Sequence, residues 1–375
     1  MRSFRKTRGQ VLAKEPREVQ NHECREVEVT IDADQEKAEL QISDPKRPSR
    51  RRRIYGRSEL SLVFAIIALG AIIEFYQHSF LGGFNVLNLL LAVSAVAIAA
   101  IGEGLVMMMG EIDLSLGSMV GLGAVVEAWA ATHGINGGVS VLIGVAAGCA
   151  GGLLNALATV YGGVSSFVVT LGTLSLFEGI TLLITNGIPI MVPAGIGGLS
   201  ETTKIGFIPM PLIIVGISAL VAAGILTRTV FGRQILAIGG NKEACRLLGI
   251  PVARRKVAVF VLAGGFAAFA GIVQAASLSA AEGGSGQADL LPIIAAVVIG
   301  GVSLYGGRGT ITGILLGALL LGEIQNGYVA LHLSSFLQEA TFGAVIVAAG
   351  LADQARSGRF KGSMESLVHR LRPPS

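Results

Sequence analysis

Long apolar segments alternate with short polar ones along most of this chain, from about residue 58 to residue 353. A helix that crosses a bilayer needs about 20 mostly apolar residues, within a range of roughly 17 to 25. The pattern therefore predicts an all-α polytopic membrane protein with about ten transmembrane helices, at residues 59–78, 86–109, 114–132, 139–160, 165–185, 209–227, 256–278, 288–305, 310–330 and 336–353. Gly and Pro interrupt the neighbourhoods of the fifth and eighth segments, so either could instead be a re-entrant or broken helix.

The distribution of Lys and Arg orients these segments. Between Leu60 and Thr227 the only Lys or Arg is Lys204, whereas seven Lys and Arg residues lie between Arg228 and Lys256. Cytoplasmic loops of membrane proteins carry an excess of Lys and Arg. With a cytoplasmic N-terminus and ten spans, all the basic groups from Arg228 onward fall inside. We therefore predict six spans before the basic loop at 228–256, four spans after it, and both termini in the cytoplasm.

The polar ends of the chain are predicted to be tails outside a membrane domain that covers residues 58–353. Residues 1–57 hold 15 of the 29 Lys and Arg residues and 10 of the 25 acidic residues, without hydrophobic periodicity, and are predicted to be disordered. Four consecutive Arg residues at 50–53 end this tail. We interpret them as a juxtamembrane cluster that contacts anionic lipid, in preference to a nucleic-acid-binding segment. A second cytoplasmic tail is predicted at 354–375.

A shift of 169 residues aligns parts of the two halves. It superimposes identical residues, namely Gly144 and Gly148 on Gly313 and Gly317, and Ser-Ser-Phe at 165–167 on the same tripeptide at 334–336. The same shift places spans two to five over spans seven to ten, which run in opposite directions in the predicted topology. We therefore predict an inverted repeat, an arrangement common in transporters, with the substrate path at the repeat interface.

The composition and the motifs of the sequence do not indicate a catalytic site. Gly occurs 52 times, which is about twice the usual share of roughly 7%, and small residues let membrane helices approach closely. The three Cys and five His residues show no metal-ligand spacing, and the sequence has no GxxxxGK[ST] phosphate-binding loop. We therefore predict that the chain is not an enzyme and that it binds no metal or cofactor.

Glu103 lies deep in the second apolar segment, where a charge costs roughly 2.5–3.5 kcal/mol on insertion scales. Three interpretations remain open: a place in the substrate pathway, a buried hydrogen bond between helices, or proton coupling.

A polar interruption at residues 110–121, GEIDLSLGSMVG, separates the second and third apolar segments and has two interpretations. Asp113 and Ser115 could cap the next helix, or the helix could be broken so that its N-terminal amides face the pathway. Gly117 and Gly121 form a GxxxG pattern within it.

Further polar side chains on neighbouring segments suit a neutral, polyhydroxylated solute. The alternative is that these hydroxyl groups form hydrogen bonds to carbonyls of their own helix, as they often do. Together with the residues of the interruption they make up the candidate substrate pathway, which consists of Glu103, Asp113, Ser115, Asn155, Ser166, Phe167 and Thr170.

Four blocks of sequence make a family resemblance recognisable. They are GEGLVMMMGEIDLSLGS at 102–118, SSFVVTLGTLSLFEGITLLITNGIPI at 165–190, AIGGNKEACRLLGIPVARRKVAVFVLAG at 237–264 and IGGVSLYGGRGTITGILLGALLLGEIQNG at 299–327. From about Leu60 to Asp353 the chain resembles the permease subunits of ATP-binding-cassette importers for ribose, xylose, arabinose and galactose. It departs from their usual pattern at Cys245, where Ala is usual, and at Glu111, where Gly is usual.

The resemblance implies a set of partners. Two permease subunits, identical or closely related, would line one path in the bacterial inner membrane and pair with a cytoplasmic ATPase that uses ATP and Mg²⁺. A periplasmic binding protein would deliver a monosaccharide, and nucleic acid is not expected as a partner. Two alternatives stay open: the same architecture for another solute, such as a branched-chain amino acid, a nucleoside, a sugar alcohol or a furanosyl signal molecule, or a proton- or sodium-driven transporter with Glu103 as the coupling carboxylate.

The resemblance also assigns the basic loop to contact with the ATPase. The residues concerned are Gly240, Asn241, Lys242, Glu243, Ala244, Arg246 and Gly249. We predict a short helix between Gly240 and Gly249, with charged contacts to the ATPase from Lys242, Glu243 and Arg246. Gly249 stands where this helix would end, and is predicted to need a special backbone angle or a close approach.

Overall fold

The apolar segments form helices in the computed structural model, which describes residues 49–192, 199, 204–205 and 208–356. From Arg52 onward these residues belong to one unit. The helices are α2 (Ser49–Tyr76), α3 (Gly83–Met108), α4 (Leu116–Thr132), α5 (Gly137–Val160), α6 (Ser166–Thr185), α7 (Met210–Arg228), α8 (Val230–Gly240), α9 (Lys242–Leu247), α10 (Val252–Leu278), α11 (Ser285–Ile299), α12 (Ile311–Ala330) and α13 (Ser335–Arg356).

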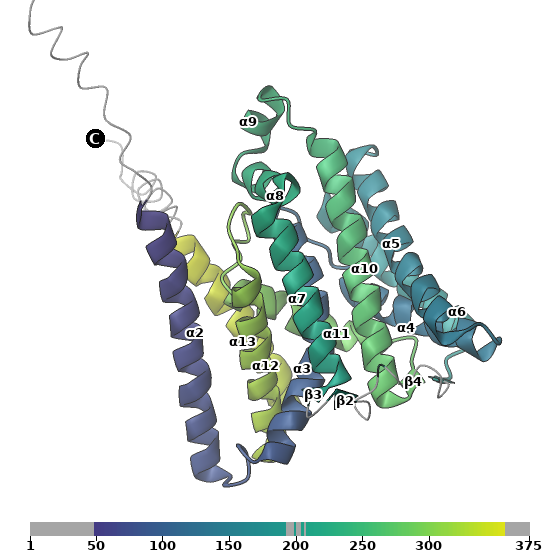
Figure 1. Cartoon of the computed structure of the whole chain (residues 1–375), viewed down its shortest axis with the longest axis vertical. Helices are drawn as coiled ribbons and strands as arrows, with labels where there is room; N and C mark the ends of the chain where they lie inside the picture. The colour runs from purple at the N-terminus through teal and green to yellow at the C-terminus, as the bar shows by residue number, and fades with distance from the viewer. Residues whose placement is uncertain (1–48, 193–198, 200–203, 206–207, 357–375) are drawn as a thin grey trace, which may run out of the picture. The chain divides into compact units, whose positions relative to one another are not determined.

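The strands of the described chain are short and join loops between helices. β1 (Ile190–Met191) pairs antiparallel with β4 (Ala280–Ala281), and β2 (Lys204–Ile205) pairs antiparallel with β3 (Ile208–Pro209). The labels β2, β3 and β4 lie at the lower end of the unit in Figure 1, whereas α8 and α9 lie at its upper end. The two ends of the helices therefore carry different kinds of structure.

Eight helices in the described part of the chain are long and apolar enough to cross a bilayer, and they are α2 from Glu59 onward, α3, α5, α6, α7, α10, α12 and α13. The apolar helices α4 and α11 are shorter, with 17 and 15 residues. These two correspond to the third and eighth predicted segments. The all-α polytopic membrane fold is thus confirmed, while the count of ten spans stays a prediction.

Some boundaries differ from the predicted ones. The fifth segment is the continuous 20-residue helix α6 and is not broken. The eighth segment was predicted to reach residue 305, but α11 ends at Ile299 because the chain turns at Gly301, which has a φ of +84°. Helix α2 begins at Ser49, inside the segment predicted to be disordered. The rest of that tail, residues 1–48, and most of the second tail, residues 357–375, lie outside the described residues.

The helix starts follow the 169-residue spacing seen in the sequence. Val252, Ser285 and Ser335 begin α10, α11 and α13, each 169 positions after the first residue of α3, α4 and α6, respectively. Helix α12 begins five positions later than the same spacing from α5 would place it. This agreement supports a repeat of the four helices, and the inverted orientation of the two copies stays a prediction.

The core of the unit is built around α3 and α10. Helix α3 contacts α10, α12, α11 and α7, and α10 also packs against α5 and α4. Ile98, Ile101 and Leu105 of α3 and Phe260 of α10 are completely buried. In contrast, α2, α6 and α13 present many large apolar side chains on the surface, as expected for helices that face lipid or a second subunit.

Close contact between α5 and α10 depends on two glycines that face each other. A Cβ atom placed on Gly264 would overlap the carbonyl oxygen of Gly148, and one placed on Gly148 would overlap the carbonyl oxygen of Gly264. The two backbones therefore touch directly, which is the arrangement that small residues permit in membrane helices. This contact sets the distance between α5 and α10.

Substitution of Gly264 by Ala is expected to destabilise the protein, although Ala favours a helix by about 1 kcal/mol over Gly. The added methyl group has no room, so α5 and α10 must separate. The matched control is Gly216→Ala in α7, where a Cβ would meet no atom within 4 Å. The thermal midpoint of the detergent-solubilised protein should fall for Gly264→Ala and stay level or rise for Gly216→Ala. Equal midpoints for the two variants would contradict this packing.

Candidate functional site

The basic loop folds into two helices at the end of α7. Helix α8 begins after Thr229, whose side-chain Oγ1 accepts a hydrogen bond from the Gly232 amide at 3.1 Å. Helix α9 begins after Asn241, whose Oδ1 accepts from the Ala244 amide at 3.0 Å. Both side chains satisfy amides that have no partner inside the first helical turn. The predicted short helix between residues 240 and 249 is therefore confirmed.

The end of α9 has the backbone that its sequence predicts. Gly249 follows the helix with a φ of +75°, and a Cβ there would meet no atom within 4 Å. The predicted special backbone angle is confirmed, and a close approach is not what requires glycine at this position. On the outer side of α9, Leu247 and Leu248 are 90% and 79% exposed, while Cys245 is buried. Helix α9 thus presents an apolar tip away from the helices.

Helix α8 is fastened to the end of α3 by backbone contacts. Gly239 lies so close to the carbonyl of Met108 and to the loop at Gly307 that a Cβ would overlap both, and the Gly307 amide donates a hydrogen bond to the Met108 carbonyl at 2.8 Å. Gln234 of α8 also accepts a hydrogen bond from Arg255 Nε of α10 at 2.6 Å. The α8–α9 segment is therefore held by two core helices.

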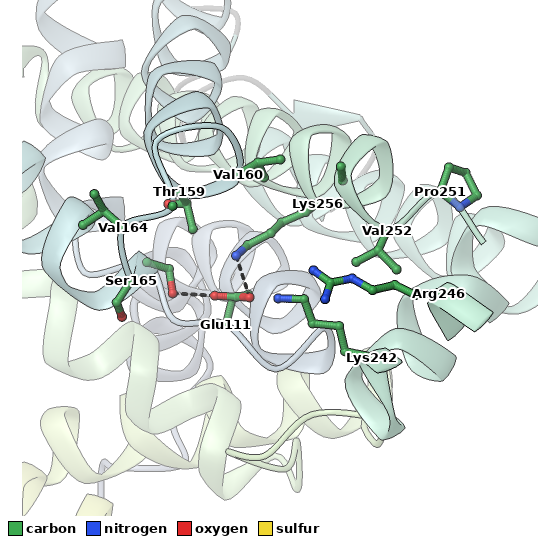
Figure 2. Close-up of a pocket in the computed structure, with 13 residues that line it drawn as sticks. Glu111, Thr159, Val160, Val164, Ser165, Lys242, Arg246, Pro251, Val252 and Lys256 are labelled. Atoms are coloured by element: carbon green, nitrogen blue, oxygen red, sulfur yellow. Dashed lines mark hydrogen bonds and ion pairs between the residues drawn. The ribbon is translucent and has the colours of Figure 1, made fainter. Parts of the chain in front are cut away.

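Glu111 joins three segments that lie far apart in the sequence. Its Oε1 lies 2.7 Å from Lys256 Nζ near the start of α10, and its Oε2 accepts a hydrogen bond from Ser166 Oγ of α6 at 2.6 Å. The side chains of Lys256 and Glu111 are only 9% and 17% exposed. Figure 2 shows the Lys256 ammonium directed at the carboxylate. This ion pair ties the interruption after α3 to the helix that follows α9.

A network of buried polar side chains lies on the other side of the same interruption. Asp113 Oδ1 accepts hydrogen bonds from the Ser115 amide at 2.9 Å and from Ser115 Oγ at 2.6 Å. Asn155 of α5 then donates to Ser115 Oγ and accepts from Thr173 Oγ1 of α6, each at 2.7 Å. Asp113, Ser115 and Asn155 are completely buried. The network therefore fixes α4, α5 and α6 around the break between α3 and α4.

Of the two interpretations of this segment, the side-chain cap is absent, and the exposure of the α4 amides to a pathway stays a prediction. Ser115 occupies the position before α4 without capping it, because its Oγ accepts from Asn155 Nδ2 and not from an amide of the first turn. Glu103 is completely buried, and its Oε1 accepts from the Asp113 amide at 3.4 Å. The glycine pattern packs as expected, since a Cβ on Gly117 would lie 2.5 Å from the carbonyl oxygen of Gly286 on α11.

The candidate pathway residues thus occupy three different environments. Four of them, Glu103, Asp113, Ser115 and Asn155, share the buried network. Ser166 binds Glu111, and Phe167 is 51% exposed on α6. Thr170 is buried, and its hydroxyl donates back to the Phe167 carbonyl at 3.4 Å, in line with the local alternative. The role of these residues in a solute path stays a prediction.

Sequence reasoning did not identify the pairing of Glu111 with Lys256. Both residues carry a visible signal, because Glu111 is an acid between two apolar segments and Lys256 is the last basic residue before another one. Their partnership is not readable from spacing, since 145 positions separate them. Only the packing of α3 against α10 brings the two charges together.

Comparison with known proteins gives a consistent result. The family model described as "Branched-chain amino acid transport system / permease component" matches residues 85–350. A ribose import permease protein of Bacillus subtilis is 36% identical over 309 residues, covering 80% of this chain and 94% of the relative. An L-arabinose ABC transporter permease protein of Azospirillum brasilense is 35% identical, covering 82% and 92%. An autoinducer 2 import system permease protein of an Enterobacter species is 36% identical, covering 77% and 84%. No solved structure matches the chain.

The buried network can be tested without any knowledge of a substrate. Asn155→Leu removes both the donor to Ser115 and the acceptor for Thr173, and should lower the free energy of unfolding by about 1–3 kcal/mol. Because Thr173→Val removes the same bond, the two losses should not add. The control is Thr132→Val, whose hydroxyl donates to carbonyls of its own helix and whose effect should add to that of Asn155→Leu. Additive losses in both double variants, measured by unfolding in detergent, would refute the network.

Proposed function

The chain belongs to the family of branched-chain amino acid transport system permease components, and we propose that it is the membrane-spanning permease subunit of an ATP-driven importer for a monosaccharide. The observation that carries this proposal is the likeness to a ribose import permease over 94% of that relative's length, combined with a folded α9 where the ATPase contact is expected. The helices would form the path, and hydrolysis of ATP would take place on a separate subunit.

A sugar is the best-supported solute. The relatives are named for ribose, L-arabinose and autoinducer 2, and the first two are pentoses. The family description refers to branched-chain amino acids, which makes an amino acid the second candidate. Its support is weaker, because no relative described above is named for one. We therefore propose a pentose or a related sugar, delivered by a periplasmic binding protein.

The surface of α9 fits the proposed contact with an ATPase. Leu247 and Leu248, at the end of α9, are 90% and 79% exposed to solvent. Burial of such side chains against a partner contributes roughly 1.5–3 kcal/mol each. Lys242 and Arg246, which are also predicted to contact the ATPase, line a pocket on the side of α9 that faces α10 and the turn between α5 and α6. Glu243, Leu247 and Leu248 are therefore the residues that we assign to the partner surface.

The contacts behind α9 provide a route for energy coupling. A displacement of α9 by the ATPase would act on Lys256 through the short connection at 248–251. From Lys256 it would reach Glu111, and from there the interruption that holds the Asp113 and Asn155 network. Coupling between distant sites needs elements that are packed or bonded to each other, and each step of this route is such a contact. The break between α3 and α4 is thus the proposed receiving end of the motion.

The orientation follows from charge. The loop of α8 and α9 is the most basic part of the chain between the tails, so we place it in the cytoplasm. The turn between α5 and α6 lies beside α9, because both line one pocket. A secondary transporter with Glu103 as its coupling carboxylate would need exchange of protons between this residue and water. Complete burial of Glu103 and its bond to the Asp113 amide favour a structural role instead.

The α9 contact is tested at Gly249. Gly249→Val places a β-branched residue at positive φ, where it is strained, so the end of α9 should distort and the ATPase should be lost on co-purification. Gly249→Asn is the matched control, because Asn tolerates the left-handed conformation. The valine variant should insert into the membrane normally while ATPase recovery and sugar uptake fall. Full recovery and full uptake with Gly249→Val would remove α9 from the coupling mechanism.

The coupling route is tested by exchanging the charges of its central pair. Glu111→Lys and Lys256→Glu each leave two like charges in a largely buried site, and breaking a buried pair costs about 3–5 kcal/mol. Each should abolish ATP-driven uptake per inserted subunit. The double exchange restores opposite charges and should recover much of the uptake, while Glu111→Gln, which keeps an acceptor for Ser166, should fall between these extremes. A double exchange as inactive as the single ones would contradict the route.

A further inference from the structure

A pocket of about 720 Å³ lies between α9, the start of α10 and the turn from α5 to α6. Its polar lining includes Lys242, Arg246 and Lys256 together with Glu111 and the two hydroxyl groups of Ser165 and Ser166. Figure 2 shows the three cationic groups directed toward the same space from α9 and α10. The coupling route involves Lys256 and Glu111 but assigns no role to Lys242 and Arg246.

The charges of this lining are not balanced. Three cations face one carboxylate, and that carboxylate is already bound by Lys256 and Ser166. Lys242 and Arg246 both lie close enough to Lys256 to act on its charge by repulsion. Within the described residues, Lys242 has no hydrogen-bond acceptor or acidic partner. Arg246 uses one nitrogen on Glu243 and keeps further donors of its guanidinium group.

This lining matches a phosphate group better than a carboxylate. A phosphate group offers several oxygen acceptors in one compact anion, so it can accept from Lys, Arg and hydroxyl donors that approach from different elements. It would also reduce the repulsion among the three cations, which a neutral sugar would not do. The serine hydroxyls lie at the start of α6, opposite the cations of α9, and would complete the set of donors.

The walls of the pocket indicate which kind of molecule carries the phosphate group. Two apolar residues of the pocket, Val160 and Val164, lie on the side of α5 and α6, where Tyr161 and Phe167 are 69% and 51% exposed. Helices α5 and α6 are candidate membrane spans. The pocket therefore opens beside surfaces that suit acyl chains, at the end of the helices that carries the basic loop. Basic pockets between helices on that side of a membrane bind anionic headgroups.

We propose that this pocket binds the headgroup phosphate of an anionic phospholipid, with Lys242, Arg246 and Lys256 as its cationic donors. The bound headgroup bridges α9 to the start of α10 on one side and to the turn between α5 and α6 on the other. The lipid thereby holds the α8–α9 segment against the helices. The placement at the cytoplasmic leaflet rests on the orientation proposed above.

The experiment measures lipid retention by the permease alone, without ATPase, ATP or sugar. Delipidated protein is titrated with phosphatidylglycerol, with phosphatidylcholine as the neutral comparison, and bound lipid is counted by native mass spectrometry. The test variant is Lys242→Gln, because it leaves the pair of Glu111 and Lys256 intact. The matched control is Arg254→Gln, an exposed cation of the same basic loop outside the pocket. Lys242→Arg keeps the charge and serves as the conservative variant.

We expect Lys242→Gln to weaken phosphatidylglycerol retention about tenfold, because it removes one hydrogen bond to a charged group, and Arg254→Gln and Lys242→Arg to leave it unchanged. Equal losses in Lys242→Gln and Arg254→Gln would overturn the proposal, because they indicate general surface attraction. A separate titration with inorganic phosphate distinguishes the source. Binding of inorganic phosphate that depends on Lys242, without dependence of the lipid, would overturn the assignment to lipid.

A third result concerns the ATPase. Unchanged lipid retention combined with reduced ATPase recovery for Lys242→Gln would mean that this lysine serves the partner, and would also overturn the proposal. Because the lipid assay contains no ATPase and no sugar, its failure leaves the transport function untouched. Conversely, a chain that transports nothing in the uptake assays could still retain the lipid.

Discussion

The ion pair between Lys256 and Glu111 is the interaction on which the proposed mechanism depends. Two charges withdrawn from water lose hydration energy, and the loss is offset only when the geometry is close and the remaining oxygens are bonded. Both conditions hold here, with 2.7 Å between the charged atoms and 2.6 Å from the second carboxylate oxygen to Ser166. Removing one partner would leave an uncompensated charge at the meeting point of α3, α6 and α10. The pair therefore favours one relative position of these three segments.

Glycine makes such a meeting point possible. Helix α8 lies against the carbonyl of Met108 because Gly239 has no side chain, and α5 lies against α10 because Gly148 and Gly264 have none. Contacts of backbone with backbone leave little freedom for relative sliding. The α8–α9 segment is consequently joined to the core by backbone contacts and by the hydrogen bond from Arg255 to Gln234, and the ion pair joins α10 to the segment after α3. We regard this as the physical basis for transmitting a movement of α9 to the interrupted segment after α3.

Much of the fold could be predicted from the sequence, because a sufficiently long apolar segment of a membrane protein usually forms a transmembrane helix. The ten predicted segments all contain a helix, and three of the four helix starts in the second half keep the 169-residue spacing. Errors arose where a tertiary partner outweighed a local signal. A side-chain cap on α4 from Asp113 or Ser115 was one of two interpretations, but Ser115 Oγ accepts from Asn155 and donates to Asp113. The pairing of Glu111 with Lys256 was missed because 145 positions separate the two residues, and only the folded chain brings them together. The contacts of Lys242 and Arg246 with an ATPase stay a prediction.

The central claim is that ATP, used by a partner, drives a sugar through this chain. The most direct measurement is uptake of labelled ribose into proteoliposomes that contain the chain with its ATPase, with the binding protein outside and ATP inside. Ionophores remove every proton and sodium gradient. The account predicts uptake that requires ATP and the binding protein and continues without any ion gradient. Uptake that proceeds without ATP and stops when the proton gradient collapses would contradict it.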